Sequence, residues 1–160
     1  MELSQVEISP PEGYQLILGQ SHFIKTVEDL YEALATAVPG LKFGVAFCES
    51  SGKALIRHDE TDEGAARLAI EYARKLSCGH AFVVVLRDAF PINVLNRIKS
   101  LQEVAGVYCA TANKVTVIVA EAEDGRGILG VIDGVKSKGV ETAADKEERK
   151  EFLRKIGYKR

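Results

Sequence analysis

The sequence has no tryptophan, one methionine and four prolines, and neither sign of charge dominates, since 21 Lys and Arg stand against 23 Asp and Glu. Proteins that bind nucleic acids usually carry an excess of basic residues that contact the phosphate backbone. This chain has no such excess, so we expect no nucleic-acid partner. The longest apolar runs, such as residues 81–86, have the length of a strand, so we predict no membrane span. The first residues contain neither a basic start nor an apolar stretch, so we predict no secretion signal and expect the cytoplasm.

Cysteine is also scarce. Cys48, Cys78 and Cys109 are widely spaced and form no C-x-x-C pair, which argues against a disulfide framework or a structural zinc site. Cys48 and Cys109 lie in apolar, strand-like runs, where cysteine is more often a small buried apolar residue than a reactive thiol. Low Met and Trp content beside abundant Lys, Glu and Arg is a composition that many thermophilic proteins share.

Hydrophobic periodicity divides the chain into interleaved strands and helices. Residues 3–8 and 14–19 alternate around a Pro-Pro-Glu-Gly turn, which predicts a hairpin. Helical spacing predicts one helix between Thr26 and Val38 and a second from Asp62 to Leu76. The other expected elements are strands over 41–49, 53–58, 81–86 (buried on both faces), 106–110 and 114–122, a helix over 91–101, short strands and turns after 123, and a helix over 145–155. This order predicts one α/β domain over residues 1–160, a sandwich of a mixed β-sheet and packed helices.

Two glycine motifs resemble phosphate-binding loops. Residues 125–130 match G-x-G-x-x-G, but the β-branched residues that follow do not favour the helix that a dinucleotide site needs. Arg126 could still contact an anion there, and a plain glycine-rich turn is the equal alternative. Residues 50–53, Ser-Ser-Gly-Lys, resemble the end of a Walker loop, but Phe47 and Ala54 break that pattern, so we favour a hairpin turn.

Three histidines, His22, His58 and His80, are the candidate bases or phosphoryl acceptors, because a neutral imidazole is populated near pH 7. His80 precedes the most apolar strand, so we expect it at the edge of the core. His58 stands among charged residues and is expected on the surface. For each histidine a purely structural role is the alternative. No H-x-x-x-H, H-E-x-x-H or Cys/His cluster predicts a metal site, and no G-x-S-x-G predicts a serine hydrolase.

Six segments together resemble one family, the small archaeal and bacterial adenosine-specific kinases. They are residues 20–34 (QSHFIKTVEDLYEAL), 38–53 (VPGLKFGVAFCESSGK), 79–86 (GHAFVVVL), 91–104 (PINVLNRIKSLQEV), 110–121 (ATANKVTVIVAE) and 125–134 (GRGILGVIDG). The resemblance implies a compact α/β fold that binds adenosine and AMP rather than ADP or ATP. It also implies a phosphorylated histidine and a symmetric oligomer, a trimer.

Carried onto this chain, the resemblance makes His80 the first candidate for the phosphorylated residue and His22 the second. Asn93 and Asn96 would bind the purine or the ribose through their amides, and Glu49 would hold the ribose hydroxyls. Lys53 and Arg126 would neutralise the phosphate.

The function that the resemblance implies is phosphoryl transfer to adenosine through a histidine, with no certain cofactor and with the phosphoryl donor left open. The alternative is a non-catalytic adenosine- or AMP-binding sensor, which the lack of a recognisable ATP-binding motif favours. A purely structural oligomer subunit is disfavoured by the polar, glycine-rich segments at the expected strand ends.

Overall fold

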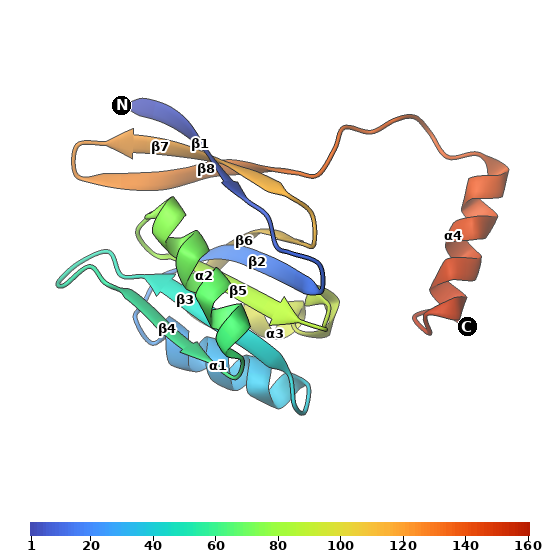
Figure 1. Cartoon of the computed structure of the whole chain (residues 1–160), viewed down its shortest axis with the longest axis horizontal. Helices are drawn as coiled ribbons and strands as arrows, with labels where there is room; N and C mark the ends of the chain where they lie inside the picture. Colours follow the sequence, from blue (N-terminus) through green and yellow to red (C-terminus); the bar gives the residue numbers. More distant parts are fainter.

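The computed structural model describes residues 1–160, whose eight strands form two sheets packed against each other (Figure 1). The larger sheet has the order β4-β3-β5-β2-β6 and the smaller one the order β1-β7-β8. All strand pairs in both sheets are antiparallel. The strands are β1 (Glu2–Ile8), β2 (Tyr14–Ser21), β3 (Lys42–Cys48), β4 (Ile56–Glu60), β5 (Ala81–Arg87), β6 (Val104–Thr111), β7 (Val115–Ala122) and β8 (Gly125–Asp133).

The five-stranded sheet is covered on both faces. Helices α1 (Thr26–Ala37) and α3 (Leu95–Lys99) pack on one face, and α2 (Glu63–Leu76) shares the other face with the three-stranded sheet. The central strand β5 contributes to both cores, because side chains alternate along a strand: Val83 faces α2 and Val84 faces α1. The expectation that residues 81–86 are buried on both faces is therefore confirmed.

Local signals fix α2 on the sheet. The Asp62 carboxylate caps the helix by accepting a hydrogen bond from the Ala65 N–H at 2.9 Å, and Ser77 ends it in the left-handed conformation. Gly44 of β3 lets the helix approach closely, because a Cβ at this position would lie 2.4 Å from the Ala66 Cα.

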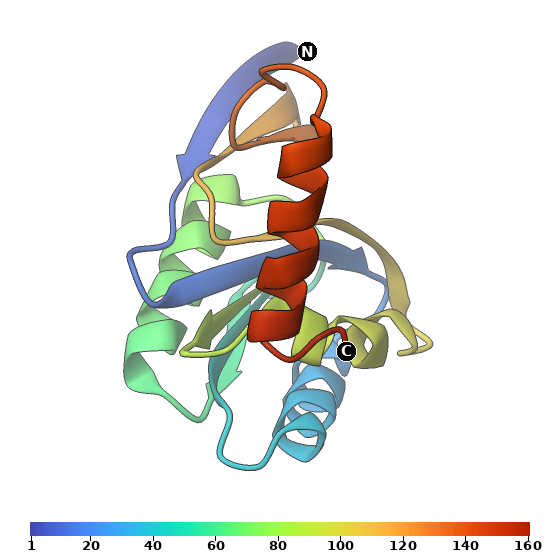
Figure 2. The ribbon, with the colours of Figure 1, turned by 90° about the vertical axis from the view of Figure 1, so that its right-hand side faces the viewer.

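The C-terminal helix α4 (Ala143–Lys155) stands apart from this body, with no buried residue. Residues 134–142 carry it away from the end of β8, and Figures 1 and 2 show it alongside the two sheets as a separate arm. None of the helices combines the length and the apolar composition that crossing a membrane requires.

The α/β class is confirmed, but four details of the prediction are wrong. Strands β1 and β2 form no hairpin, since β1 pairs with β7 and β2 with β5 and β6. The expected mixed sheet is replaced by two antiparallel sheets. Residues 125–133 of the glycine-rich segment form one strand, β8, because β7 pairs with it from Gly125 to Asp133, with one register shift between Ile118 and Val119. The helix over 91–101 is divided into a 3-10 turn, η1 (Pro91–Asn93), and the short α3.

Candidate functional site

The antiparallel order of the larger sheet brings segments that are distant in sequence together at one end of its central strands. Strand β5 lies between β2 and β3, which both run opposite to it, so the ends of β2 and β3 meet the start of β5. Two backbone hydrogen bonds join these strand ends. One runs from the Ser21 N–H to the His80 carbonyl (3.0 Å), and the other from the His80 N–H to the Cys48 carbonyl (2.7 Å). His22, Glu49 and His80 therefore lie on neighbouring strand ends.

His80 has the most unusual backbone in this region. Its φ is +63°, a left-handed conformation that few non-glycine residues adopt, and Ser77, three residues earlier, has φ +49°. The imidazole is half-buried and stacks on Phe47, with ring centroids 5.8 Å apart and an interplanar angle of 14°. A left-handed non-glycine residue costs about 1 kcal/mol or more, and such strain is concentrated at functional sites.

Beside Gly79, the residue that precedes His80, lies a hollow of about 430 Å³, a volume within the range of small-molecule sites; His80 itself is not among the residues that line it. One wall is the β3–β4 hairpin with Glu49 and Ser50, and the floor includes Ser77 and Gly79. The other wall comes from the second sheet, where the β7–β8 turn contributes Glu121, Ala122, Glu123, Asp124, Gly125 and Arg126. The hollow is thus built between the two sheets, and its rim is acidic.

Arg126 and Glu49 face this hollow but are already held by the protein. The Arg126 Nη1 donates to the Lys75 carbonyl at 3.3 Å, its Nε lies 3.6 Å from the Glu121 carboxylate, and that Nε has no hydrogen-bond partner. The Glu49 carboxylate accepts from the Leu55 N–H at 3.0 Å and from Arg57 at 3.1 Å. These two donors, the amide first, lower the pKa of Glu49, so it lies beside the hollow as an anion.

The remaining predicted residues are distributed unevenly. Lys53 is exposed in the β3–β4 turn, which is a hairpin turn as predicted. His22 is exposed, and its backbone N–H donates to the Glu103 carbonyl at 2.8 Å. His58 lies on the surface as expected, with its Nδ1 3.0 Å from the Glu60 carboxylate.

Asn93 and Asn96 are not brought together with His80. They follow the far end of β5, which at seven residues spans roughly 20 Å. The Asn93 Oδ1 accepts from the Phe90 N–H at 3.1 Å, and Asn96 lines a different hollow with Phe90 and Tyr158. Within one chain, Asn93 and Asn96, which were assigned to the purine or the ribose, therefore lie at the opposite end of β5 from His80, which was assigned to the phosphate.

Several residues at or near this end of the sheet were not recognisable from the sequence as candidate site residues. The acidic rim, Glu121, Glu123 and Asp124, resembles an ordinary solvated turn. Glu103, in the turn before β6, is only 3 % exposed, although it directly follows the exposed Gln102. The sequence motif G-x-G-x-x-G lies in β8, and its second residue, Arg126, lines the hollow.

The chain matches a protein-family model and solved structures. Residues 6–159 match the model of the family described as "Adenosine specific kinase". The crystal structure of the PH1918 protein from Pyrococcus horikoshii OT3 is 46% identical in sequence, with a TM-score of 0.94 over 99% of this chain and 98% of that one. Comparison with curated protein sequences gives no match.

Proposed function

The chain belongs to the adenosine-specific kinase family, and from that membership we propose that it binds adenosine or AMP in the hollow beside Gly79 and transfers a phosphoryl group through His80. The observation that carries the proposal is the strained His80 backbone, held by two hydrogen bonds next to a hollow of nucleoside size. Arg126 supplies a positive charge at the same hollow, on the opposite wall.

The chemistry needs two displacements. In the first, an imidazole nitrogen of His80 attacks the phosphorus of the donor, so an N–P bond forms and the bond to the donor's leaving group breaks. In the second, the 5′-hydroxyl of adenosine attacks the same phosphorus, the N–P bond breaks, and the hydroxyl proton passes to the released imidazole. The guanidinium of Arg126 would stabilise the charge on the transferring oxygens, since positioning and charge supply most of the acceleration in such reactions.

A second function, adenosine or AMP binding without catalysis, is favoured by the acidic rim. Glu121, Glu123 and Asp124 repel a polyphosphate donor but leave an uncharged nucleoside unaffected. In this alternative any phosphorylation of His80 is incidental or regulatory.

Intact mass on protein purified without acid, combined with titration calorimetry, tests both functions. We expect a phosphate-sized mass increment that adenosine discharges as AMP. His80→Asn should lose the increment, because asparagine tolerates the left-handed backbone and so removes only the imidazole. His58→Asn, on the surface, should retain the increment, and His22→Asn tests the second candidate. Adenosine binding without increment or AMP supports the binding function, and no binding contradicts both.

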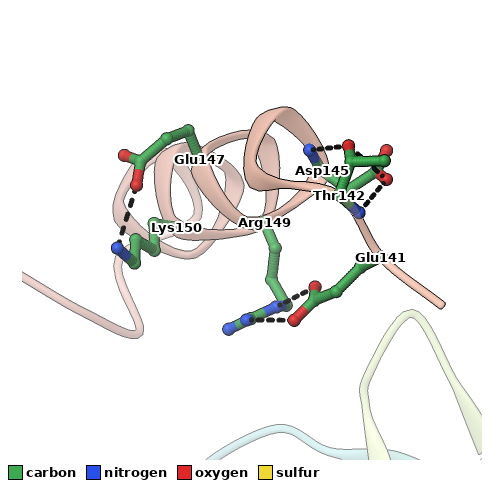
Figure 3. A network of polar contacts seen from close by, with 6 residues as sticks. All are labelled: Glu141, Thr142, Asp145, Glu147, Arg149 and Lys150. Atoms are coloured by element: carbon green, nitrogen blue, oxygen red, sulfur yellow. Dashed lines mark hydrogen bonds and ion pairs between the residues drawn. The ribbon is translucent and has the colours of Figure 1, made fainter.

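We also propose a homotrimer in which α4 packs on a neighbouring copy. The helix has local stabilising contacts: Thr142 and Asp145 form a capping box, and Arg149 pairs with Glu141 at 3.0 Å (Figure 3). Its apolar Phe152 is nevertheless 59 % exposed. The three-stranded sheet likewise exposes apolar side chains, Leu129 at 63 % and Ile132 at 55 %. Such unpaired apolar surfaces are typical of oligomer interfaces.

Light scattering on the full chain and on a variant ending at Gly134 tests the trimer. We expect a threefold mass for the full chain and a smaller assembly after removal of the arm. A monomeric full chain, or a truncated chain that stays trimeric, contradicts the role given to α4.

A further inference from the structure

Glu103 is a buried carboxyl group that no hydrogen-bond donor satisfies. It lies in the turn between α3 and β6, its side chain is 2 % exposed, and neither Oε1 nor Oε2 has a hydrogen-bond partner. An ionised carboxylate removed from water without donors is very unfavourable, and such groups become neutral when they lack full compensation.

The charges around Glu103 are too few to compensate it. The Lys25 ammonium is 3.9 Å from the Glu103 carboxylate, but it makes its short contact, 2.9 Å, with Asp29. The other charged side chains of the adjoining helix α3, Arg97 and Lys99, are exposed and form no ion pair with Glu103. One cation therefore serves two carboxyl groups.

We propose that Glu103 is a neutral carboxylic acid at neutral pH and in this form clamps the β2–α1 loop next to Ser21, whose N–H donates to the His80 carbonyl. The proton on Glu103 makes the cluster of Lys25, Asp29 and Glu103 neutral as a whole. Loss of that proton leaves one uncompensated negative charge in the interior, so the clamp weakens on the alkaline side.

The clamp is connected to the proposed site through the backbone. The Glu103 carbonyl accepts from the His22 N–H at 2.8 Å, and the next amide back, that of Ser21, donates to the His80 carbonyl at 3.0 Å. The Thr26 hydroxyl donates to the Ser21 hydroxyl at 2.7 Å, which joins the same loop to the first turn of α1. A loosened Glu103 turn therefore disturbs the peptide that fixes His80, and this last step rests on the proposed function.

The pKa shifts agree in direction with this geometry. Burial, and then the Asp29 carboxyl, raise the pKa of Glu103, whereas the hydrogen bond from Lys25 lowers the pKa of Asp29. Because the folded-state pKa of Glu103 exceeds its ordinary value of 4.5, its contribution to stability is complete below pH 4.5 and is lost as the pH rises through the raised pKa.

The test compares the wild type with Glu103→Gln, whose amide keeps the shape of the neutral acid and cannot ionise. Between about pH 5 and pH 9, where carboxyl groups with raised pKa titrate, we expect the melting temperature of the wild type to fall progressively relative to Glu103→Gln. Glu32→Gln, an exposed position on α1, should follow the wild type at every pH. Carbon-13 labelling should show the Glu103 carboxyl protonated at pH 7.

Adenosine affinity, measured over the same pH range, tests the connection to the site. We expect the Kd of the wild type to weaken by about threefold or more toward alkaline pH, a modest coupling, and that of Glu103→Gln to change less. An ionised Glu103 at pH 7, or a melting difference independent of pH, overturns the neutral state of Glu103. Parallel Kd profiles in the two proteins overturn the clamp's effect on the site. The melting and carbon-13 measurements need no nucleoside, so a failure of adenosine binding contradicts the proposed function alone.

Discussion

Gly79→Ala is the substitution for which the structure gives the sharpest expectation at the site. A Cβ on Gly79 would lie 2.8 Å from the Ser50 Cβ, whereas carbon atoms make comfortable contacts at about 3.5–4.0 Å. The shortfall of roughly 1 Å must be met by movement, and Ser50, exposed in the β3–β4 hairpin, is the side that can move. The hollow should therefore change shape while the core stays intact.

Overpacking costs about 1–3 kcal/mol, and a movable hairpin places Gly79→Ala near the lower limit. A loss of about 1 kcal/mol corresponds to a melting temperature lower by about 2–4 °C for a chain of this size. If adenosine contacts both walls of the hollow, its affinity should fall by about fivefold, the equivalent of about 1 kcal/mol.

Two further variants make this prediction refutable. Gly125→Ala lines the same hollow, but its Cβ would meet nothing within 4 Å, so neither stability nor affinity should change appreciably. Adding Ser50→Gly to Gly79→Ala removes the clashing atom and should restore affinity, and the coupling appears in a double-mutant cycle of calorimetric Kd values. Equal behaviour of the two alanine variants, or no rescue by Ser50→Gly, would refute the steric argument.

Three other outcomes are expected. Gly44→Ala should lower the free energy of unfolding by about 3 kcal/mol in urea titrations, because its Cβ would meet the α2 backbone, whereas Gly127→Ala, with open space around it, should not. Asp62→Ala removes the α2 cap and should cost about 1–2 kcal/mol at neutral pH. The Ala65 N–H, and then Arg87, lower the pKa of Asp62, so thermal melts should show this cost shrinking as the pH falls below 3.8; a constant cost would contradict it. Asp124→Lys reverses a charge on the rim of the hollow and should raise AMP affinity relative to adenosine in calorimetry, while an unchanged ratio would place the phosphate elsewhere.

The sequence predicted the elements whose signals are local. The apolar run of β5, the Asp62 cap and the helical spacing of α2 are all readable within about fifteen residues. The pairing of β1 was not predictable in this way, because its partner β7 lies more than a hundred residues later. The Pro-Pro-Glu-Gly turn between β1 and β2 is genuine, but it carries the chain from one sheet to the other instead of closing a hairpin.

Sequence reasoning named candidate residues for the site by their side-chain chemistry, but it did not find a residue whose chemistry depends on burial. The family resemblance named His80, Glu49 and Arg126 as candidates; Glu49 and Arg126 line one hollow, and His80 follows Gly79, which lines the same hollow. Glu103 was not identified, because nothing in a polar turn indicates that its carboxyl is enclosed. Asn93 and His80 lie at opposite ends of β5. Which segments meet at each end of that strand depends on the topology of the whole sheet.

The two walls of the hollow belong to different sheets, and this makes the site sensitive to how the sheets pack. The β3–β4 hairpin moves with the larger sheet and the β7–β8 turn with the smaller one, and the two sheets are joined by an apolar core that includes Val83, Val117 and Val119. Interiors are close-packed and deform little, so this core fixes the separation of the two sheets from which the walls extend. A ligand that contacts both walls therefore gains affinity from a sheet separation that the core has already set. The same rigidity holds His80 in a backbone conformation that an isolated strand end would not keep.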